Sequence, residues 1–182
     1  MTETVEPVKA DINWVDKECR YTEWRTPEKI LAPARAFFGG RILLDPATDP
    51  SNPTNAIKFF TESDNGLIQD WDVPWFVNCP YGNGIRNWTA KIYKSSRVGG
   101  IALLPCGARF STRYWQADIL NEYLYGVCFV KGRVSFIGPD GKPAKGNRHD
   151  SAIYAYGPDR SSDFGKLFSP LGKTFIGNIF KP

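Results

Sequence analysis

Four consecutive residues near the middle of the chain could hold a planar amino group. Asn78, Cys79, Pro80 and Tyr81 follow the apolar run 73–77, which is typical of a buried strand. The asparagine side chain carries a carbonyl acceptor, the proline biases the residue before it to an extended backbone, and the tyrosine offers a ring face for stacking. The pattern predicts a pocket for a planar base that bears an amino group.

A second candidate group lies earlier in the chain. The apolar run 41–44 ends in Asp45-Pro46-Ala47, which predicts a buried strand followed by a turn that exposes a carboxylate. The carboxyl ends of strands are where open α/β sheets bind ligands. Residues 48–55 are rich in Pro, Ser, Asn and Asp instead of the glycines that embrace a pyrophosphate, so we do not expect a dinucleotide or a nucleoside triphosphate.

Apolar periodicity predicts the elements that must position these groups. We expect helices over 27–38, 87–96 and 114–124, and strands over 41–44, 73–77, 101–105, 127–136 and 151–156, with a further short element over 56–61. Thr26 is expected to cap the first helix and Gly39-Gly40 to end it. The repeated order of strand, functional turn and helix predicts an α/β sheet of parallel strands with helices on both faces.

The length of 182 residues fits one domain. We expect an N-terminal arm over residues 1–20, the main domain over 21–160, and a C-terminal tail over 161–182 that docks on the domain. No apolar run approaches the roughly 20 residues that span a bilayer, so we expect a cytoplasmic protein without membrane contact. The sequence does not indicate an oligomeric state.

The cysteines do not predict a metal site. Cys19, Cys79, Cys106 and Cys128 show no CxxC spacing, and the single histidine, His149, has no cysteine neighbour. We therefore expect no metal, and we expect reduced thiols.

The charge permits a polyanionic partner without requiring one. The chain has 23 basic and 19 acidic residues, a net charge of +4. Several basic residues follow the predicted strand ends in the second half, and the candidates for phosphate contacts are Arg109, Arg113, Lys131, Arg133 and Arg148. A solvated surface without a ligand is an equally open interpretation of these residues.

Six motifs occur in a fixed order along the chain. They are Glu23-Trp24-Arg25-Thr26-Pro27, Leu44-Asp45-Pro46-Ala47, Asp64-Asn65-Gly66-Leu67 with Asp70-Trp71, Asn78-Cys79-Pro80-Tyr81, Leu103-Leu104-Pro105 and Lys131-Gly132-Arg133. In this order they resemble the phage DNA N-6-adenine methyltransferases, the Dam-type family, from about Glu23 to Tyr156. The resemblance implies a Rossmann-like methyltransferase sheet, double-stranded DNA as substrate and, for a phage-encoded protein, the host cell cytoplasm.

The resemblance also implies S-adenosylmethionine as cofactor. It places Thr26 and Pro27 near the methionine end, Asp45, Pro46 and Ala47 at the methionine amino group, and Asp64 at the adenosine end. Only 33 positions (78 − 45) separate the strand-end acid from Asn78, which leaves little room for two intervening strand units. We therefore allow for a shortened sheet.

The family's catalytic tetrad has Asp, Asn or Ser first, then two prolines and an aromatic residue. Cys79 departs from it at the second position, but that position acts through its backbone carbonyl, which a cysteine retains. The resemblance therefore implies that Asn78, Cys79, Pro80 and Tyr81 act on a flipped adenine. The rival hypothesis is that Cys79 is a nucleophile, as in cytosine-C5 enzymes. Those enzymes have the order Pro-Cys, whereas this chain has Cys-Pro.

Two alternative functions stay open. One is methyl transfer to another amino nitrogen, such as cytosine N4 or a protein amide. The other is a non-catalytic DNA-binding protein on the same scaffold. The tetrad holds any planar amino group and does not choose among them, whereas the motif order and the basic second half favour adenine in DNA.

Overall fold

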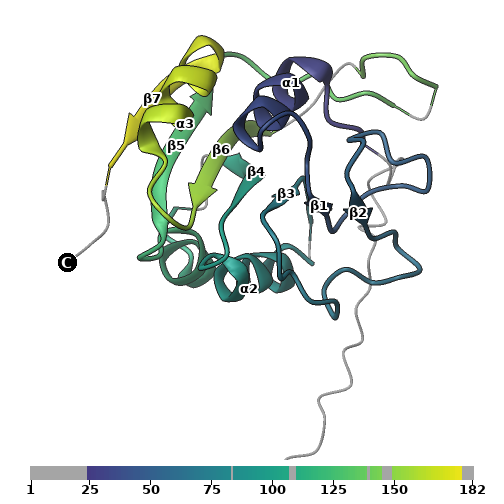
Figure 1. Cartoon of the computed structure of the whole chain (residues 1–182), viewed down its shortest axis with the longest axis horizontal. Coiled ribbons are helices and arrows are strands. Elements are labelled where there is room, and N and C mark those ends of the chain that lie inside the picture. The colour runs from purple at the N-terminus through teal and green to yellow at the C-terminus, as the bar shows by residue number, and fades with distance from the viewer. Residues whose placement is uncertain (1–23, 83, 107–109, 139, 145–148, 178–182) are drawn as a thin grey trace, which may run out of the picture.

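A computed structural model describes residues 24–82, 84–106, 110–138, 140–144 and 149–177 (Figure 1). Its elements in chain order are α1 (Glu28–Phe37), β1 (Leu44–Asp45), β2 (Lys58–Phe59), β3 (Trp75–Val77), α2 (Ile85–Ser95), β4 (Gly100–Cys106), the π-helix η1 (Trp115–Ile119), β5 (Leu124–Val130), β6 (Asp150–Tyr156), α3 (Ser161–Phe168), the 3-10 helix η2 (Ser169–Leu171) and β7 (Gly172–Ile176). The described strands form one sheet in the order β2-β1-β3-β4-β6-β5-β7.

The sheet is mixed. Strands β2, β1, β3 and β4 are parallel neighbours, as the sequence predicts. The expectation of parallel strands is wrong for β6, which runs antiparallel to both β4 and β5. The edge strand β7, which also runs antiparallel to β5, lies in the segment that the sequence predicts only as a docked tail. Two consecutive strands that pair in parallel need a crossover connection, which is usually a helix. The described part of the chain between β5 and β6 contains no helix.

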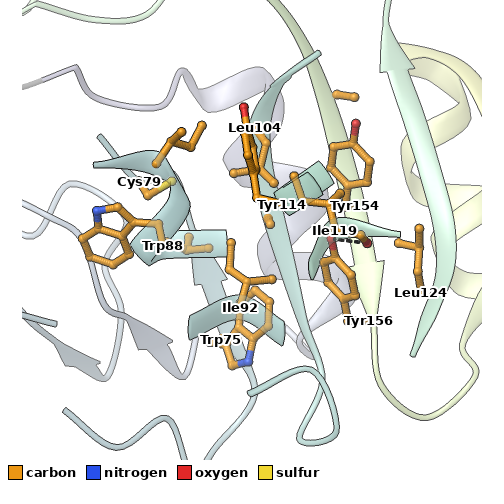
Figure 2. Close-up of a cluster of buried hydrophobic side chains, with 14 of the residues drawn as sticks. Trp75, Cys79, Trp88, Ile92, Leu104, Tyr114, Ile119, Leu124, Tyr154 and Tyr156 are labelled. Carbon is orange, nitrogen blue, oxygen red and sulfur yellow. Dashed lines mark hydrogen bonds between the residues drawn. The ribbon is translucent and has the colours of Figure 1, made fainter. Parts of the chain in front are cut away.

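Helices cover both faces of the sheet (Figure 1). On one face, Phe37 of α1 packs with Phe164 and Phe168 of α3. On the other, Trp88 of α2 and Trp115 of η1 belong to one buried aromatic and aliphatic cluster, shown in part in Figure 2. The strands supply alternate residues to the two clusters, as their pleat requires, so that the sheet is buried on both sides.

Helix α1 confirms the helix predicted over 27–38, but its start differs from the expectation. Thr26 does not cap it: the N-cap residue is Pro27, no side chain caps the helix, and the Pro27 carbonyl accepts the Ile30 N–H at 2.9 Å. The predicted end is confirmed, because Gly39 and Gly40 adopt positive φ angles of 79° and 110°.

Three other predicted elements are displaced. The strand expected over 41–44 is β1, which begins only at Leu44. The strand expected over 127–136 ends at Val130, two residues before Gly132 turns the chain with a φ of 72°. The helix expected over 114–124 is replaced by the short η1, because the Asn121 side chain binds the Asp118 carbonyl at 2.7 Å and the Tyr123 N–H at 2.9 Å and directs the chain into β5.

Candidate active site

The predicted site residues lie where the connections of the sheet reverse direction. Strands β1 and β3 are adjacent and parallel. After β1 the chain continues to β2 on one side, and after β3 it continues to β4 on the other. The loops that follow β1 and β3 therefore diverge, and ligands bind α/β sheets at such switch points, outside the carboxyl ends of the strands. Asp45 is the last residue of β1, and Asn78 directly follows β3.

The segment before α1 lies at the carboxyl ends of these strands and makes hydrogen bonds to three loops. The Trp24 carbonyl accepts a hydrogen bond from Asn78 Nδ2 at 3.3 Å. The Arg25 guanidinium pairs with Asp49 at 2.8 Å. The Arg25 backbone N–H donates to the Ile137 carbonyl, and the Arg25 carbonyl accepts the Ile137 N–H, both at 2.9 Å. The motif that the sequence places near the cofactor is thus tied to the loops after β1 and β3.

Asp45 is a buried carboxylate with an exposed fraction of only 2%. It accepts the Thr54 hydroxyl at 2.7 Å and the Ala47 N–H at 3.1 Å. Loss of water on burial raises its pKa from 3.8 to about 6, because these hydrogen bonds offset the desolvation only in part. No cationic side chain in the described residues pairs with it. A positively charged group of a ligand would therefore find an uncompensated negative charge here.

The loop after β1 holds Thr54 in place through the Asn52 side chain. Asn52 adopts a left-handed φ of 49°, which asparagine tolerates better than most residues. Its Oδ1 accepts the Ala56 N–H at 3.1 Å, and its Nδ2 donates to the Ala56 carbonyl at 3.0 Å. Asn52 Oδ1 also accepts the Thr54 hydroxyl at 3.3 Å, which helps to hold that hydroxyl against Asp45.

The turn 61–67 packs directly onto the loop after β1. A Cβ atom on Gly66 would lie 1.9 Å from the Pro46 carbonyl oxygen, so only glycine allows this approach. Asp64 itself is exposed and caps the turn, accepting the Thr61 N–H at 2.8 Å and the Thr61 hydroxyl at 2.7 Å. Those hydrogen bonds lower the pKa of Asp64. The structure brings its turn to the site, while its contact with adenosine stays a prediction.

Asn78 is oriented by its bond to the Trp24 carbonyl. The amide nitrogen is the atom engaged, so the side-chain oxygen is left without a partner in the described part of the chain. The Cys79 carbonyl likewise receives no backbone N–H from the described residues. Two adjacent acceptors thus remain unused at the carboxyl end of β3, which suits the two hydrogens of an amino group.

The Cys79 thiol is buried and packs in the cluster of Figure 2. Burial raises its pKa to about 12, so the thiol is protonated at neutral pH. A nucleophilic cysteine needs the opposite, a lowered pKa in an electropositive and partly exposed environment. The geometry favours a role for the backbone carbonyl of Cys79 over a role for its sulfur.

Tyr81 is held at three points. Its hydroxyl donates to the Leu103 carbonyl of β4 at 3.4 Å, and its ring makes edge contacts with Phe136 and His149 at centroid distances of 6.3 and 6.2 Å. Burial raises the pKa of Tyr81 well above its usual value, so the phenol stays neutral. These contacts hold the ring as a neutral aromatic surface three positions after Asn78 in the chain.

Three of the five predicted phosphate contacts lie in the described residues, and all three are exposed at the same edge. Arg113 follows β4, and Lys131 and Arg133 follow β5, which runs parallel to β4 because both are antiparallel to β6. Arg133 and Asp150 form an exposed ion pair at 3.9 Å. Arg109 and Arg148 lie outside the described residues.

Sequence reasoning missed three residues of this region. Thr54 binds Asp45 from an irregular loop that has no periodic pattern. Trp24 belongs to the first motif, but the bond from Asn78 to its carbonyl spans 54 positions and has no local signal. Arg86 did have one. It is a basic residue in the first turn of α2, where the helix dipole favours acids.

The fold defines an α/β protein whose candidate site residues lie at a switch point of its sheet. Residues 15–160 match the family model of the DNA N-6-adenine-methyltransferases (Dam), and the chain belongs to that family. Comparison with curated proteins and with solved structures found no match. Within the described residues, no helix is long and apolar enough to cross a membrane.

Proposed function

We propose that the protein transfers a methyl group from S-adenosylmethionine to the N6 atom of an adenine flipped out of double-stranded DNA. Family membership supports the DNA adenine-N6 methyltransferase activity. The orientation of Asn78 carries the finer proposal, because its bond to Trp24 engages the amide nitrogen and leaves the side-chain oxygen without a partner among the described residues. The parallel strands β2-β1-β3-β4, with helices on both faces of the sheet, support a Rossmann-like methyltransferase sheet.

The charge and burial of Asp45 fit the proposed cofactor. S-adenosylmethionine supplies an electrophilic methyl group when bound, and it carries an ammonium group and a sulfonium centre. Asp45 is the buried carboxylate without a cationic partner in the described residues, and a charge-assisted hydrogen bond to the ammonium group would compensate it. The residues proposed to hold the cofactor are Thr26, Pro27, Asp45, Pro46, Ala47 and Asp64.

The proposed chemistry follows from two acceptors and one ring. The lone pair of the adenine amino nitrogen is delocalised into the base, so catalysis must localise it. Asn78 Oδ1 and the Cys79 carbonyl would accept the two amino hydrogens and stabilise the positive charge that grows on nitrogen in the transition state. Tyr81 would stack on the base, which is worth about 1–3 kcal/mol for stacked bases in general. Arg113, Lys131 and Arg133 are proposed phosphate contacts, as are Arg109 and Arg148.

Two measurements test this function together. Calorimetric titration should detect binding of S-adenosylmethionine, and mass analysis of nucleosides from treated DNA should find N6-methyldeoxyadenosine. Methylation at cytosine N4 would replace the substrate assignment, and methylation of a protein amide would remove DNA as substrate. DNA binding without cofactor binding would leave a non-catalytic DNA-binding protein.

Replacing Cys79 with alanine should leave methyl transfer within about 10-fold of the wild type, because the high pKa keeps the thiol from acting as a nucleophile and the backbone carbonyl is retained. The measurement is the single-turnover rate of methyl transfer to DNA. Cys128→Ala is the matched control, since Cys128 is also buried but lies in the opposite cluster. A folded Cys79→Ala protein without any turnover would restore the nucleophile hypothesis.

A further inference from the structure

An open pocket lies between the first turn of α2 and the start of η1. It has a volume of about 280 Å³ and is lined by Arg86, Thr112, Arg113, Tyr114, Ala117 and Asp118. We propose that this pocket binds a backbone phosphate of the DNA strand that carries the target base. The inference rests on the proposed function and adds a site for the substrate backbone, with Arg86 as a contact that is not among the five phosphate contacts predicted from the sequence.

The charges of the pocket favour an anion. Arg86 and Arg113 are exposed, and neither pairs with an acid in the described part of the chain. The single acid of the lining, Asp118, accepts the Thr89 hydroxyl at 3.1 Å. Helix α2 has 11 residues, no acid in its first turn and no side-chain cap, so its N-terminal dipole adds to the two guanidinium charges.

Tyr114, one of the residues that line the pocket, carries a buried hydroxyl that lacks a partner. Tyr114 is only 8% exposed, and its buried hydroxyl has no hydrogen-bond partner among the residues that the structure describes. Figure 2 shows this hydroxyl directed away from Trp75 and Ile92. The Arg86 guanidinium lies 5.9 Å from the centroid of the Tyr114 ring. A buried hydroxyl without a partner is costly, and a phosphate oxygen is an acceptor that would satisfy it.

The pocket lies at the edge of the sheet that carries the candidate active site. Arg86 is five positions after Tyr81 (86 − 81), and Arg113 follows the carboxyl end of β4. Cys79 and Tyr114 belong to the same buried cluster. A flipped nucleotide remains joined to the strand on both sides, so a phosphate must lie close to the base pocket, and this basic pocket is positioned to receive it.

The salt dependence of DNA binding tests the proposal. Each phosphate neutralised on duplex DNA contributes about 0.9 to the slope of log affinity against log salt. The double variant Arg86→Ala/Arg113→Ala should lower that slope by about 0.9, so that between 50 and 200 mM salt it loses about 3.5-fold less affinity than the wild type. Fluorescence anisotropy with a labelled duplex gives the slope, and equal thermal melting shows that the variant is folded.

Three further variants separate the pocket from general charge effects. Arg97→Ala removes one exposed charge beyond the far end of α2 and should leave the slope unchanged. Arg86→Lys/Arg113→Lys keeps the charge and should retain most of the slope, whereas Tyr114→Phe should weaken binding at every salt concentration without changing the slope. Inorganic phosphate should compete with DNA for the wild type and not for the double alanine variant.

The outcomes distinguish this inference from the proposed function. A double variant with the wild-type slope overturns the phosphate site, even if the wild type methylates adenine. A slope that falls equally in Arg97→Ala shows only a diffuse charge effect and also overturns it. Wild-type protein that binds DNA with a pocket-dependent slope but transfers no methyl group keeps the phosphate site and overturns the proposed reaction.

Discussion

Replacing Asn78 with alanine should reduce the rate of methyl transfer by at least about 10²–10³-fold, the usual cost of removing one preorganised transition-state contact. The variant loses the side-chain oxygen proposed to accept an amino hydrogen. Cofactor affinity should stay near the wild-type value, because the residues proposed to hold the cofactor lie on other segments. Single-turnover methylation of DNA and calorimetry with S-adenosylmethionine measure the two quantities separately.

Asn78→Asp sharpens the test. Aspartate keeps an acceptor but loses the Nδ2 donor to the Trp24 carbonyl, a hydrogen bond of 3.3 Å. Its rate should lie between those of the wild type and Asn78→Ala. Asn87→Ala, which changes an exposed asparagine on α2, is the matched control and should behave as the wild type. An alanine variant at Asn78 with normal turnover would contradict the assignment, and one that loses cofactor binding would move Asn78 to the cofactor site.

Replacing Asp45 with asparagine should weaken cofactor binding and at the same time stabilise the protein without cofactor. Loss of a hydrogen bond to a charged partner costs about 1.5–3 kcal/mol, or about 10–150-fold in affinity. The stabilising effect arises because burial raises the pKa of Asp45 from 3.8 to about 6. The folded protein therefore retains a proton there that the unfolded chain has already released, and stability falls as pH rises through this interval.

The pH dependence gives this prediction a definite sign. Below about pH 4 the Asp45 carboxyl is protonated in both states, so wild type and Asp45→Asn should be similarly stable. Above about pH 6 the wild type carries the buried charge, and the variant should be more stable by up to ~3 kcal/mol. Urea unfolding at pH 4 and pH 8 without cofactor measures the difference.

The exposed residue Asp72, which pairs with Lys58 at 3.6 Å, supplies the control for this pH effect. Asp72→Asn should change stability by only a few tenths of a kcal/mol at either pH, as is usual for surface pairs. A variant Asp45→Asn that is less stable than the wild type at pH 8 would show that the carboxylate is compensated in the folded protein. Unchanged cofactor affinity would remove Asp45 from the proposed site.

Local sequence patterns were sufficient for much of the parallel half of the fold. The helix over 87–96 and the strand over 101–105 are confirmed within two residues at each end, because each is a continuous apolar or amphipathic run between glycines. The insertion of β6 between β4 and β5 was not predictable in this way. Its strand was recognised from residues 151–156, but its neighbours depend on pairing between distant segments, which no local period encodes.

The candidate site shows the same division. Asn78 and Asp45 were predictable, because a polar residue directly after an apolar run marks a strand end. Their partners were not, since the Trp24 carbonyl lies 54 positions before Asn78 and Thr54 reaches Asp45 from an irregular loop. Asp64 shows how a motif can also serve local structure, because its carboxylate binds Thr61 three residues earlier.

The position of β6 also constrains how the chain folds during synthesis. Strand β5 is made before β6, yet it joins the sheet only through β6. Until residues 150–156 have left the ribosome, β4 presents an open edge and β5 has no place in the sheet. Unpaired apolar edges of this kind promote association between nascent chains. The sheet beyond β4 is therefore expected to assemble in one late cooperative step, in which β6 pairs with β4 and with β5.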